Sequence, residues 1–285
     1  LWIRSIIFMI KIKIEKPFKL EDTITCGQIF RFFKMEDGSF DIILKDRVIN
    51  VYEKNNYLYV SSNNEDDLKS VVMNYFDLDN DYSKINEYLL KQDKKLDDAI
   101  NFSKGLMMIK QDPFETIMEY IISANNSVPS IASALNNIAL KYGKKVMFNN
   151  KEYYLFPQYK DLKDVKESDL RECKVGFRDK YLKNIIDKLN NNELDLGSFY
   201  SMDTKEALDK LMENIGIGPK VASCILLFAY QKYDVFPVDT WVKKVMKTKY
   251  NIEGEKNIRF FASITYGKYS GIAIQYLFNY GRNSN

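Results

Sequence analysis

Residues 214–228, "NIGIGPKVASCILLF", join a glycine-rich turn to an almost wholly apolar run. Gly216 and Gly218 permit left-handed backbone or the close approach of a ligand, and Pro219 suits the first position of a helix. The segment therefore predicts one helix before the turn and a second helix that begins near Lys220. The free N–H groups of the turn then lie at a helix N-terminus, which favours binding of an anion, above all phosphate.

The segment in front of the turn has the pattern of the first helix. In "SMDTKEALDKLMENIG", residues 201–216, Asp203 is the expected N-cap and Glu206 stands at the third helical position. The helix should end at Ile215, with Gly216 as its stop. Two helices joined by such a turn form the helix-hairpin-helix pattern, L-x-x-I-x-G-I-G-x-K in form. The alternative is an ordinary tight turn between two helices.

Lys220 is unusual because it opens a helix whose next residues are nearly all apolar. Burial of a lysine costs free energy unless something compensates. Desolvation and the positive end of the helix both disfavour the ammonium form, and a lysine with a lowered pKa is a nucleophile. The alternative is a solvated lysine beside a turn, or a simple phosphate contact.

Asp239 is the expected partner of Lys220. It lies nineteen positions later, in "VFPVDTWVKKV" (residues 235–245), where Pro237 ends a connection and a third helix starts. If the second helix runs out and the chain folds back, Asp239 returns towards Lys220. A lysine beside a carboxylate suits attack on a sugar C1′, because the carboxylate stabilises the developing cation. The alternative role for Asp239 is that of an N-cap.

Composition limits the other chemistries. The chain has 285 residues, of which 46% are hydrophobic and 28% charged, which fits a globular protein with a sizeable core. A formal net charge of +3 is too small to argue for nucleic-acid binding by itself. Histidine is absent, which excludes Ser-His-Asp and Cys-His catalysis and histidine metal sites. Three scattered cysteines cannot hold a four-cysteine cluster, so we expect no metal, no cofactor and a reducing, cytoplasmic compartment.

The first part of the chain predicts an antiparallel sheet over roughly residues 8–62. "MIKIKIE" (9–15) alternates strictly between apolar and polar residues. Asp37-Gly38 joins two β-type runs as a hairpin, and Asn55-Asn56 marks a second turn. A helix that ends near Asp77 should follow.

The remainder predicts helices. In "QDPFETIMEYIISANN" (111–126), Asp112 is the expected N-cap, with Pro113 first and Glu115 third in the helix. The opening "LWIRSIIFM" lacks a cleavage signal and is too short to span a bilayer. We interpret it as an edge strand or a leader, with Met9 as a candidate start. The fold class is therefore α+β, with the boundary near residue 100.

These motifs resemble the helix-hairpin-helix glycosylase superfamily, whose bifunctional members carry a lysine in the hairpin and an aspartate about one helix later. More narrowly, the chain resembles the 8-oxoguanine DNA glycosylase/lyase family. The narrower resemblance rests on "CGQIFRF" (26–32), "SANNS" (123–127), "GFRDKYL" (176–182) and "GKYSGIAIQYLF" (267–278). It implies an antiparallel, TBP-like sheet domain over residues 1–100, followed by an all-α helix-hairpin-helix glycosylase domain over residues 101–285.

The resemblance implies roles for the catalytic and base-binding residues. Lys220 attacks C1′ of the damaged nucleotide, expels the base and forms a Schiff base, after which β-elimination cuts the strand on the 3′ side. Asp239 positions or activates Lys220 and stabilises the sugar cation. Gly27 offers its carbonyl to the N7–H that 8-oxoguanine has and guanine lacks. Cys224 and Phe278 stack on the two faces of the flipped base, although without the resemblance Cys224 is a small core residue.

One position departs from the family pattern. The family reads the Watson–Crick edge of the base with a glutamine on its C-terminal helix, and an ungapped match places Ile274 there with Gln275 next to it. A shift of one residue turns a helical side chain by about 100°. We expect Gln275 to read the base, with the helix register open between these two residues.

Other residues match positions that the family places against the opposite strand. Asn125 matches an asparagine that contacts the estranged cytosine, Phe177 an aromatic wedge, and Arg178 an arginine that reads cytosine. A second arginine of the eukaryotic-type family is replaced by Ser130. Loss of one such contact should relax discrimination by roughly 1–3 kcal/mol. We therefore expect a weaker preference for cytosine opposite the lesion.

Contacts to DNA phosphates are expected from the turn glycines Gly216 and Gly218 and from lysines that follow Asp239. These lysines are Lys243, Lys244, Lys247 and Lys249, for each of which a solvated helix face is the alternative. The eukaryotic-type motif has a histidine two residues after the aspartate, where Trp241 stands here. That contact to the 5′ phosphate is therefore absent or replaced.

The resemblance implies a monomer that acts on double-stranded DNA containing 8-oxoguanine, in a bacterial cytoplasm, at the nucleoid during repair and away from membranes. One rival is a glycosylase for another damaged base. However, the alkylbase enzymes lack the hairpin lysine, and the endonuclease-III and adenine-glycosylase types carry a four-cysteine iron–sulfur loop. The other rival is a non-catalytic hairpin module that grips DNA, which needs the glycines but neither Lys220 nor Asp239.

Overall fold

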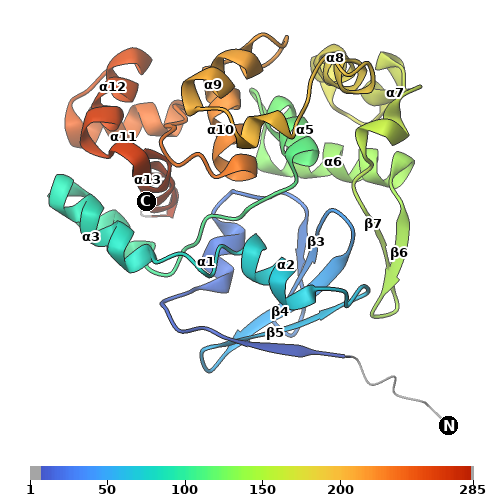
Figure 1. Ribbon diagram of the computed structural model, residues 1–285, viewed down its shortest axis with the longest axis horizontal. Helices are drawn as coiled ribbons and strands as arrows, with labels where there is room; N and C mark the ends of the chain where they lie inside the picture. The colour runs from blue at the N-terminus through green and yellow to red at the C-terminus, as the bar shows by residue number, and fades with distance from the viewer. Residues whose placement is uncertain (1–7, 284–285) are drawn as a thin grey trace.

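The computed structural model describes residues 8–283 and shows a twisted sheet beneath a broad layer of helices (Figure 1). Residues 1–7, which we interpreted as an edge strand or leader, lie outside the described residues, as do residues 284–285. Within the described part, no helix is both long enough and apolar enough to cross a membrane.

The sheet has five antiparallel strands in the order β1-β5-β4-β3-β2. They are β1 (Ile10–Lys13), β2 (Phe32–Lys34), β3 (Phe40–Ile43), β4 (Val48–Lys54) and β5 (Tyr57–Ser62). The two predicted turns are confirmed. Gly38 has φ +83° between β2 and β3, and Asn55 and Asn56 have φ of +53° and +61° between β4 and β5. Short polar side chains tolerate this left-handed region, so both turns follow from local sequence.

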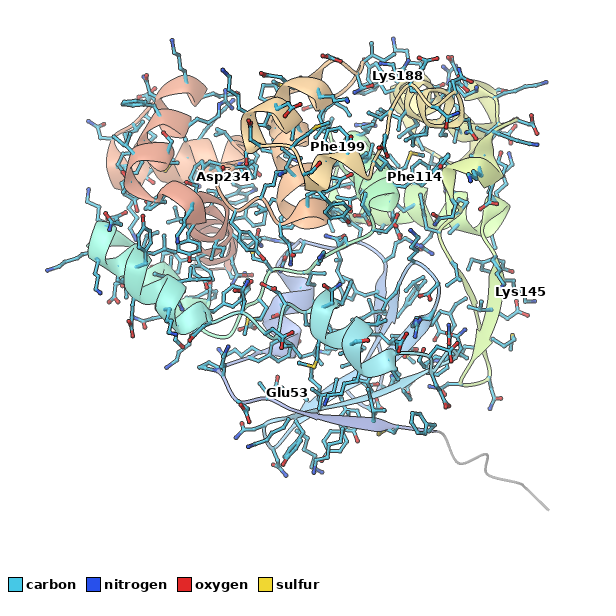
Figure 2. The ribbon with its side chains drawn as sticks, viewed as in Figure 1. Glu53, Phe114, Lys145, Lys188, Phe199 and Asp234 are labelled. Carbon is cyan, nitrogen blue, oxygen red and sulfur yellow. The ribbon has the colours of Figure 1, made fainter. Side chains whose placement is uncertain are left out.

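The helices of the first part are α1 (Leu20–Thr25), α2 (Leu68–Tyr75), α3 (Tyr82–Gln92) and α4 (Asp97–Phe102). The helix predicted to end near Asp77 is confirmed as α2, and Asp77 itself has φ +52°. Glu53 of β4 accepts a hydrogen bond from the backbone N–H of Leu20 at 3.0 Å, which fixes the start of α1 against the sheet (Figure 2).

The helical layer is built from the α-helices of the second part of the chain. They are α5 (Pro113–Ile122), α6 (Val128–Tyr142), α7 (Glu167–Glu172), α8 (Asp179–Asn190), α9 (Thr204–Met212), α10 (Pro219–Tyr230), α11 (Thr240–Tyr250), α12 (Glu255–Thr265) and α13 (Ser270–Asn283). The predicted N-cap of α5 is confirmed, since the Asp112 carboxylate accepts from the N–H groups of Phe114 and Glu115. Phe114 and Phe199 both lie inside this layer (Figure 2).

The second part is not wholly helical, which corrects the all-α prediction for residues 101–285. Strands β6 (Lys145–Phe148) and β7 (Lys151–Tyr154) form a hairpin that extends beside the sheet near β3 (Figure 1). Its turn again consists of two asparagines with positive φ. The Tyr153 hydroxyl donates to the Asp41 carboxylate of β3. The hairpin is thus stabilised by a partner 112 residues away in sequence, which the local pattern does not reveal.

Candidate active site

The predicted helix-hairpin-helix is present, and its first helix differs from the prediction in where it ends. Asp203 is the N-cap of helix α9 as predicted, and its carboxylate accepts from the Glu206 N–H at 2.8 Å. The helix ends at Met212 rather than Ile215. The Asn214 side-chain amide donates to the carbonyls of the last turn, at 3.1 Å and 3.0 Å, and so closes the helix early. Helix α10 begins at Pro219, as predicted, and Gly218 is its N-cap.

The two turn glycines have different reasons to be glycine. Gly216 has φ +84°, and a Cβ atom there would lie 2.5 Å from the ring of Tyr181. Gly218 has φ −93°, and no described atom lies within 4 Å of the place of its Cβ. Gly216 is therefore required by the fold, whereas Gly218 leaves open space outside the N-terminus of α10. That space suits a ligand such as a phosphate.

Lys220 lies half-buried in the first turn of α10. Its Nζ donates to Ser123 Oγ at 3.3 Å and lies 5.2 Å from the centre of the Tyr120 ring. That ring stacks on Phe228, with centres 5.4 Å apart. Sequence reasoning did not single out Ser123 or Tyr120. The one signal for Ser123 was its place at the head of the asparagine-rich loop.

The structure brings Lys220, Cys224 and Asp239 together. Cys224 is buried, and this burial raises the pKa of its thiol, while the nearby Lys220 ammonium lowers it and the Asp239 carboxylate raises it. Asp239 is the N-cap of α11, with Oδ1 accepting from the Val242 N–H at 2.8 Å. Among the described residues, no ion pair of 4.0 Å or less joins Lys220 to Asp239. The carboxylate therefore acts on this site through its field rather than through a direct bond to the amine.

Gly27 lies in a turn whose neighbouring carbonyls are both held by side chains. Gln275 Nε2 donates to the Cys26 carbonyl at 3.3 Å, and Gln111 Nε2 donates to the Gln28 carbonyl at 2.9 Å. Gly27 itself has φ +89°. Within the described part of the chain, its carbonyl accepts no hydrogen bond. The Gly27 carbonyl is thus a free hydrogen-bond acceptor in a turn that the hydrogen bonds to its neighbours hold in place.

Helix α13 covers this turn. A Cβ atom on Gly27 would lie 3.4 Å from the Phe278 ring, so Phe278 is where a base beside Gly27 could stack. Gln275 is buried, 6% exposed, and its amide is occupied by Cys26 as described. Ile274 instead shares an apolar niche with Trp241 and Phe278. Base reading by Gln275 stays a prediction.

The opposite-strand residues gather at the loop between α5 and α6. Asn125 is exposed there with φ +50°. Arg178 is buried, which lowers the pKa of its guanidinium. It donates to the carbonyls of Ala124, Asn125 and Val175. Phe177 is 54% exposed beside it. In this structure Arg178 fixes the Asn125 loop, and its reading of cytosine stays a prediction.

The lysines after Asp239 are not equivalent. Three of them pair with carboxylates of the protein. These pairs are Lys243–Glu255, Lys247–Glu253 and Lys249–Asp98, at 2.6, 3.0 and 3.9 Å. Lys244 has no carboxylate partner among the described residues and lies 5.5 Å from the centre of the Trp241 ring. Of the four, Lys244 is therefore the one most available to a phosphate.

Known proteins share this two-part organisation. Residues 9–117 match a family model described as 8-oxoguanine DNA glycosylase, N-terminal domain, and residues 118–263 match one described as HhH-GPD superfamily base excision DNA repair protein. A probable N-glycosylase/DNA lyase of Methanothermobacter thermautotrophicus is 31% identical over 242 residues, or 76% of each chain. The N-glycosylase/DNA lyase of Saccharomyces cerevisiae is 29% identical over 207 residues, which cover 68% of this chain and 54% of the yeast protein.

A solved structure agrees along nearly the whole chain. It is Clostridium acetobutylicum 8-oxoguanine glycosylase/lyase in complex with double-stranded DNA containing cytosine opposite to 8-oxoguanine. The identity is 41% and the TM-score 0.91, over 95% of this chain and 93% of that one. The chain belongs to the HhH-GPD superfamily of base excision DNA repair proteins. Within that class it is an 8-oxoguanine DNA glycosylase/lyase, which excises 8-oxoguanine from DNA.

Proposed function

We propose that this 8-oxoguanine DNA glycosylase/lyase uses Lys220 as its nucleophile. The observation that carries the proposal is the meeting of Lys220, Cys224 and Asp239 at the start of α10, beside the open N-terminus of that helix. The neutral amine attacks C1′ of the flipped nucleotide, and the C1′–N9 bond breaks as the base leaves with its electron pair and gains a proton. The attached amine then loses a proton, and its lone pair forms the C1′=N bond of a protonated Schiff base as the C1′–O4′ bond of the sugar breaks and O4′ gains a proton.

Strand cleavage follows from the same adduct. The positively charged imine acidifies C2′–H, so that loss of this proton expels the 3′ phosphate by β-elimination. Asp239 stabilises the cationic sugar through its charge, which its N-cap bond to Val242 holds in place. The function of Ser123 is to orient the lysine amine by its hydrogen bond.

The base is recognised between the Gly27 turn and α13. The free carbonyl of Gly27 accepts the N7–H of 8-oxoguanine, while Cys224 and Phe278 stack on the two faces of the base. The absence of a side chain at Gly27 lets the base approach, because a Cβ would lie against the Phe278 ring. Gln275 is retained as a candidate for the Watson–Crick edge.

The partner is double-stranded DNA. Asn125 and Phe177 are exposed and enter the duplex at the vacated position, with Arg178 against the estranged cytosine. Gly216, Gly218, Lys243 and Lys244 contact phosphates, Lys244 most directly. The enzyme acts as a monomer in the cytoplasm. The reducing compartment is supported by three buried cysteines without disulfide bonds, which are Cys26, Cys173 and Cys224.

Single-turnover assays on a duplex with one 8-oxoguanine test the role of Lys220. Lys220→Gln should lose both base release and strand cleavage. Lys69→Gln is the matched control, because Lys69 is exposed on α2, outside the hairpin and the candidate site. Base release by Lys220→Gln at the wild-type rate would contradict the proposal.

A further inference from the structure

Three side chains of α13 face the Gly27 turn. Gln275, Phe278 and Arg282 are spaced by three and four residues, which places them on one face of the helix. Gln275 holds the Cys26 carbonyl. Phe278 and Arg282 lie over Gly27, where a Cβ would meet an Arg282 guanidinium nitrogen at 3.3 Å and a Phe278 ring carbon at 3.4 Å.

The guanidinium of Arg282 is free. The residue is exposed, and among the described residues it has neither an ion pair nor a hydrogen-bond partner. By contrast Arg178, Arg31 and Arg47 all donate to carbonyls or carboxylates of the protein. A guanidinium has five N–H donors in a planar fork. Those of Arg282 are therefore available beside the turn that carries the free Gly27 carbonyl.

The chemistry of the lesion matches this pair of groups. The edge of 8-oxoguanine around N7 presents the N7–H donor between two acceptors, O6 and O8. If Gly27 accepts from N7–H, a donor next to Gly27 lies beside one of those two oxygens. Arginine is the side chain that most often donates to the N7/O6 edge of guanine. An ungapped match places Ile274, which cannot donate a hydrogen bond, at the Watson–Crick position of the family, and the amide of the neighbouring Gln275 donates to the Cys26 carbonyl.

We propose that Arg282 is a further specificity-determining residue, which donates to the exocyclic carbonyl oxygen beside N7 of the flipped base. The proposal rests on the proposed role of Gly27. Together the two residues read an acceptor–donor pair that guanine, with no N7–H, does not complement. Recognition of the lesion is thereby concentrated on its N7 edge.

The Arg282→Ala variant distinguishes a contact of Arg282 with the flipped base from a contact with the sugar–phosphate backbone of the DNA. Single-turnover excision of 8-oxoguanine should fall by about tenfold or more. Strand cleavage at a preformed abasic site, which has no base to read, should stay at the wild-type rate. Arg282→Lys, which keeps the charge but loses the fork, should recover only part of the loss. Arg259→Ala is the matched control, since Arg259 on α12 is paired with Glu255.

A duplex containing 8-oxoadenine identifies the oxygen that is read. This base keeps N7–H and O8 but carries an amino group at C6, so a loss confined to 8-oxoguanine assigns O6 and an equal loss on both lesions assigns O8. Equal losses on 8-oxoguanine and on the abasic site would overturn the proposal in favour of a phosphate contact. Unchanged rates on every substrate would overturn it as well. If the wild type excised guanine as readily as 8-oxoguanine, the result would contradict the proposed role of Gly27, on which the proposal for Arg282 rests.

Discussion

In the proposed mechanism, the Asp239 carboxylate combines a structural role with a chemical one. Oδ1 caps α11 through Val242, while the other oxygen accepts no hydrogen bond from the described residues. The charge therefore stays close to Lys220 and Cys224 without being neutralised by an ion pair. A fixed negative charge of this kind stabilises a sugar cation, because the protein has already ordered it before the reaction.

Asp239→Asn should separate these two roles. Asparagine caps a helix as well as aspartate does, so the Tm should stay near that of the wild type. Excision should fall by about 10²–10³-fold, because the charge is lost. Single-turnover rates and thermal unfolding measure the two effects. Asp203→Asn makes the same exchange at the N-cap of α9, and equal losses in both variants would contradict a chemical role for Asp239.

At the scale of elements, the start of α6 bears on opposite-base preference. Ser127 caps this helix, and the hydroxyl groups of Ser127 and Ser130 lie 2.9 Å apart. A serine held to its own helix in this way cannot replace the long arginine fork of the eukaryotic-type family. The enzyme should therefore have a weaker preference for cytosine opposite the lesion, and should also excise 8-oxoguanine opposite adenine.

Cleavage of matched lesion:C and lesion:A duplexes measures this preference. Ser130→Arg should raise the ratio of the lesion:C rate to the lesion:A rate by about tenfold, within the range expected for one bidentate contact to a base. Ser133→Arg, one turn further along α6, controls for the added charge. Strict dependence of the wild type on cytosine would refute the expectation.

In the turn between α9 and α10, alanine substitutions at the two glycines should have different consequences. Gly216→Ala should destabilise the fold by about 2 kcal/mol or more, because a positive φ and a clash with Tyr181 both oppose the new methyl group. Gly218→Ala should lower the Tm only slightly, since the site is open and the one cost is that alanine is a poorer N-cap than glycine, and it should weaken duplex binding. Thermal unfolding and fluorescence anisotropy test the pair. Wild-type binding by Gly218→Ala would mean that DNA does not approach this turn.

At the scale of the whole molecule, buried charges join the two layers. Arg31 pairs with Glu115 at 2.9 Å, and both side chains are buried. Glu119 lies beside this pair, 2% exposed, with Oε2 unpartnered in the described structure. Burial, reinforced by the charge of Glu115, raises the pKa of Glu119 well above its usual value. The interior therefore favours the neutral form of this carboxyl group.

The raised pKa of Glu119 in the folded state makes the stability of the protein depend on pH. The contribution of neutral Glu119 is fully present below the unfolded pKa and is lost as the pH rises through the folded pKa. Glu119→Gln, which mimics the neutral form, should match the wild type near about pH 4 and exceed its stability increasingly at higher pH. Thermal unfolding as a function of pH tests this. Parallel curves for the two proteins would contradict it.

Local signals predicted much of the fold because local interactions create them. The caps at Asp112 and Asp203 and the turn at Asn55-Asn56 are determined within a few residues. The β6–β7 hairpin carried the same asparagine pair but was not predicted. Its short strands depend on Tyr153 meeting Asp41 of the sheet, a contact that only the folded chain brings about.

The contacts of the candidate site likewise fall into those that local sequence predicts and those that only the folded chain brings about. Glycines, a lysine and an aspartate at fixed spacing were sufficient to predict that Lys220 and Asp239 lie near one another, and both are close enough to affect the pKa of Cys224. The contact of Lys220 with Ser123, 97 residues away, depends on how α5 packs against α10. The approach of Arg282 to Gly27 depends on how α13 packs over the turn that follows α1. Neither arrangement has a signature within its own segment.

Borohydride trapping on a duplex carrying one 8-oxoguanine tests the central claim most directly. Reduction converts a lysine Schiff base into a stable amine, so wild-type protein should remain covalently joined to the DNA. Lys220→Gln should give no adduct while retaining binding to the duplex. An adduct of undiminished yield with Lys220→Gln, or none with the wild type despite base release, would contradict the assignment of Lys220 as nucleophile.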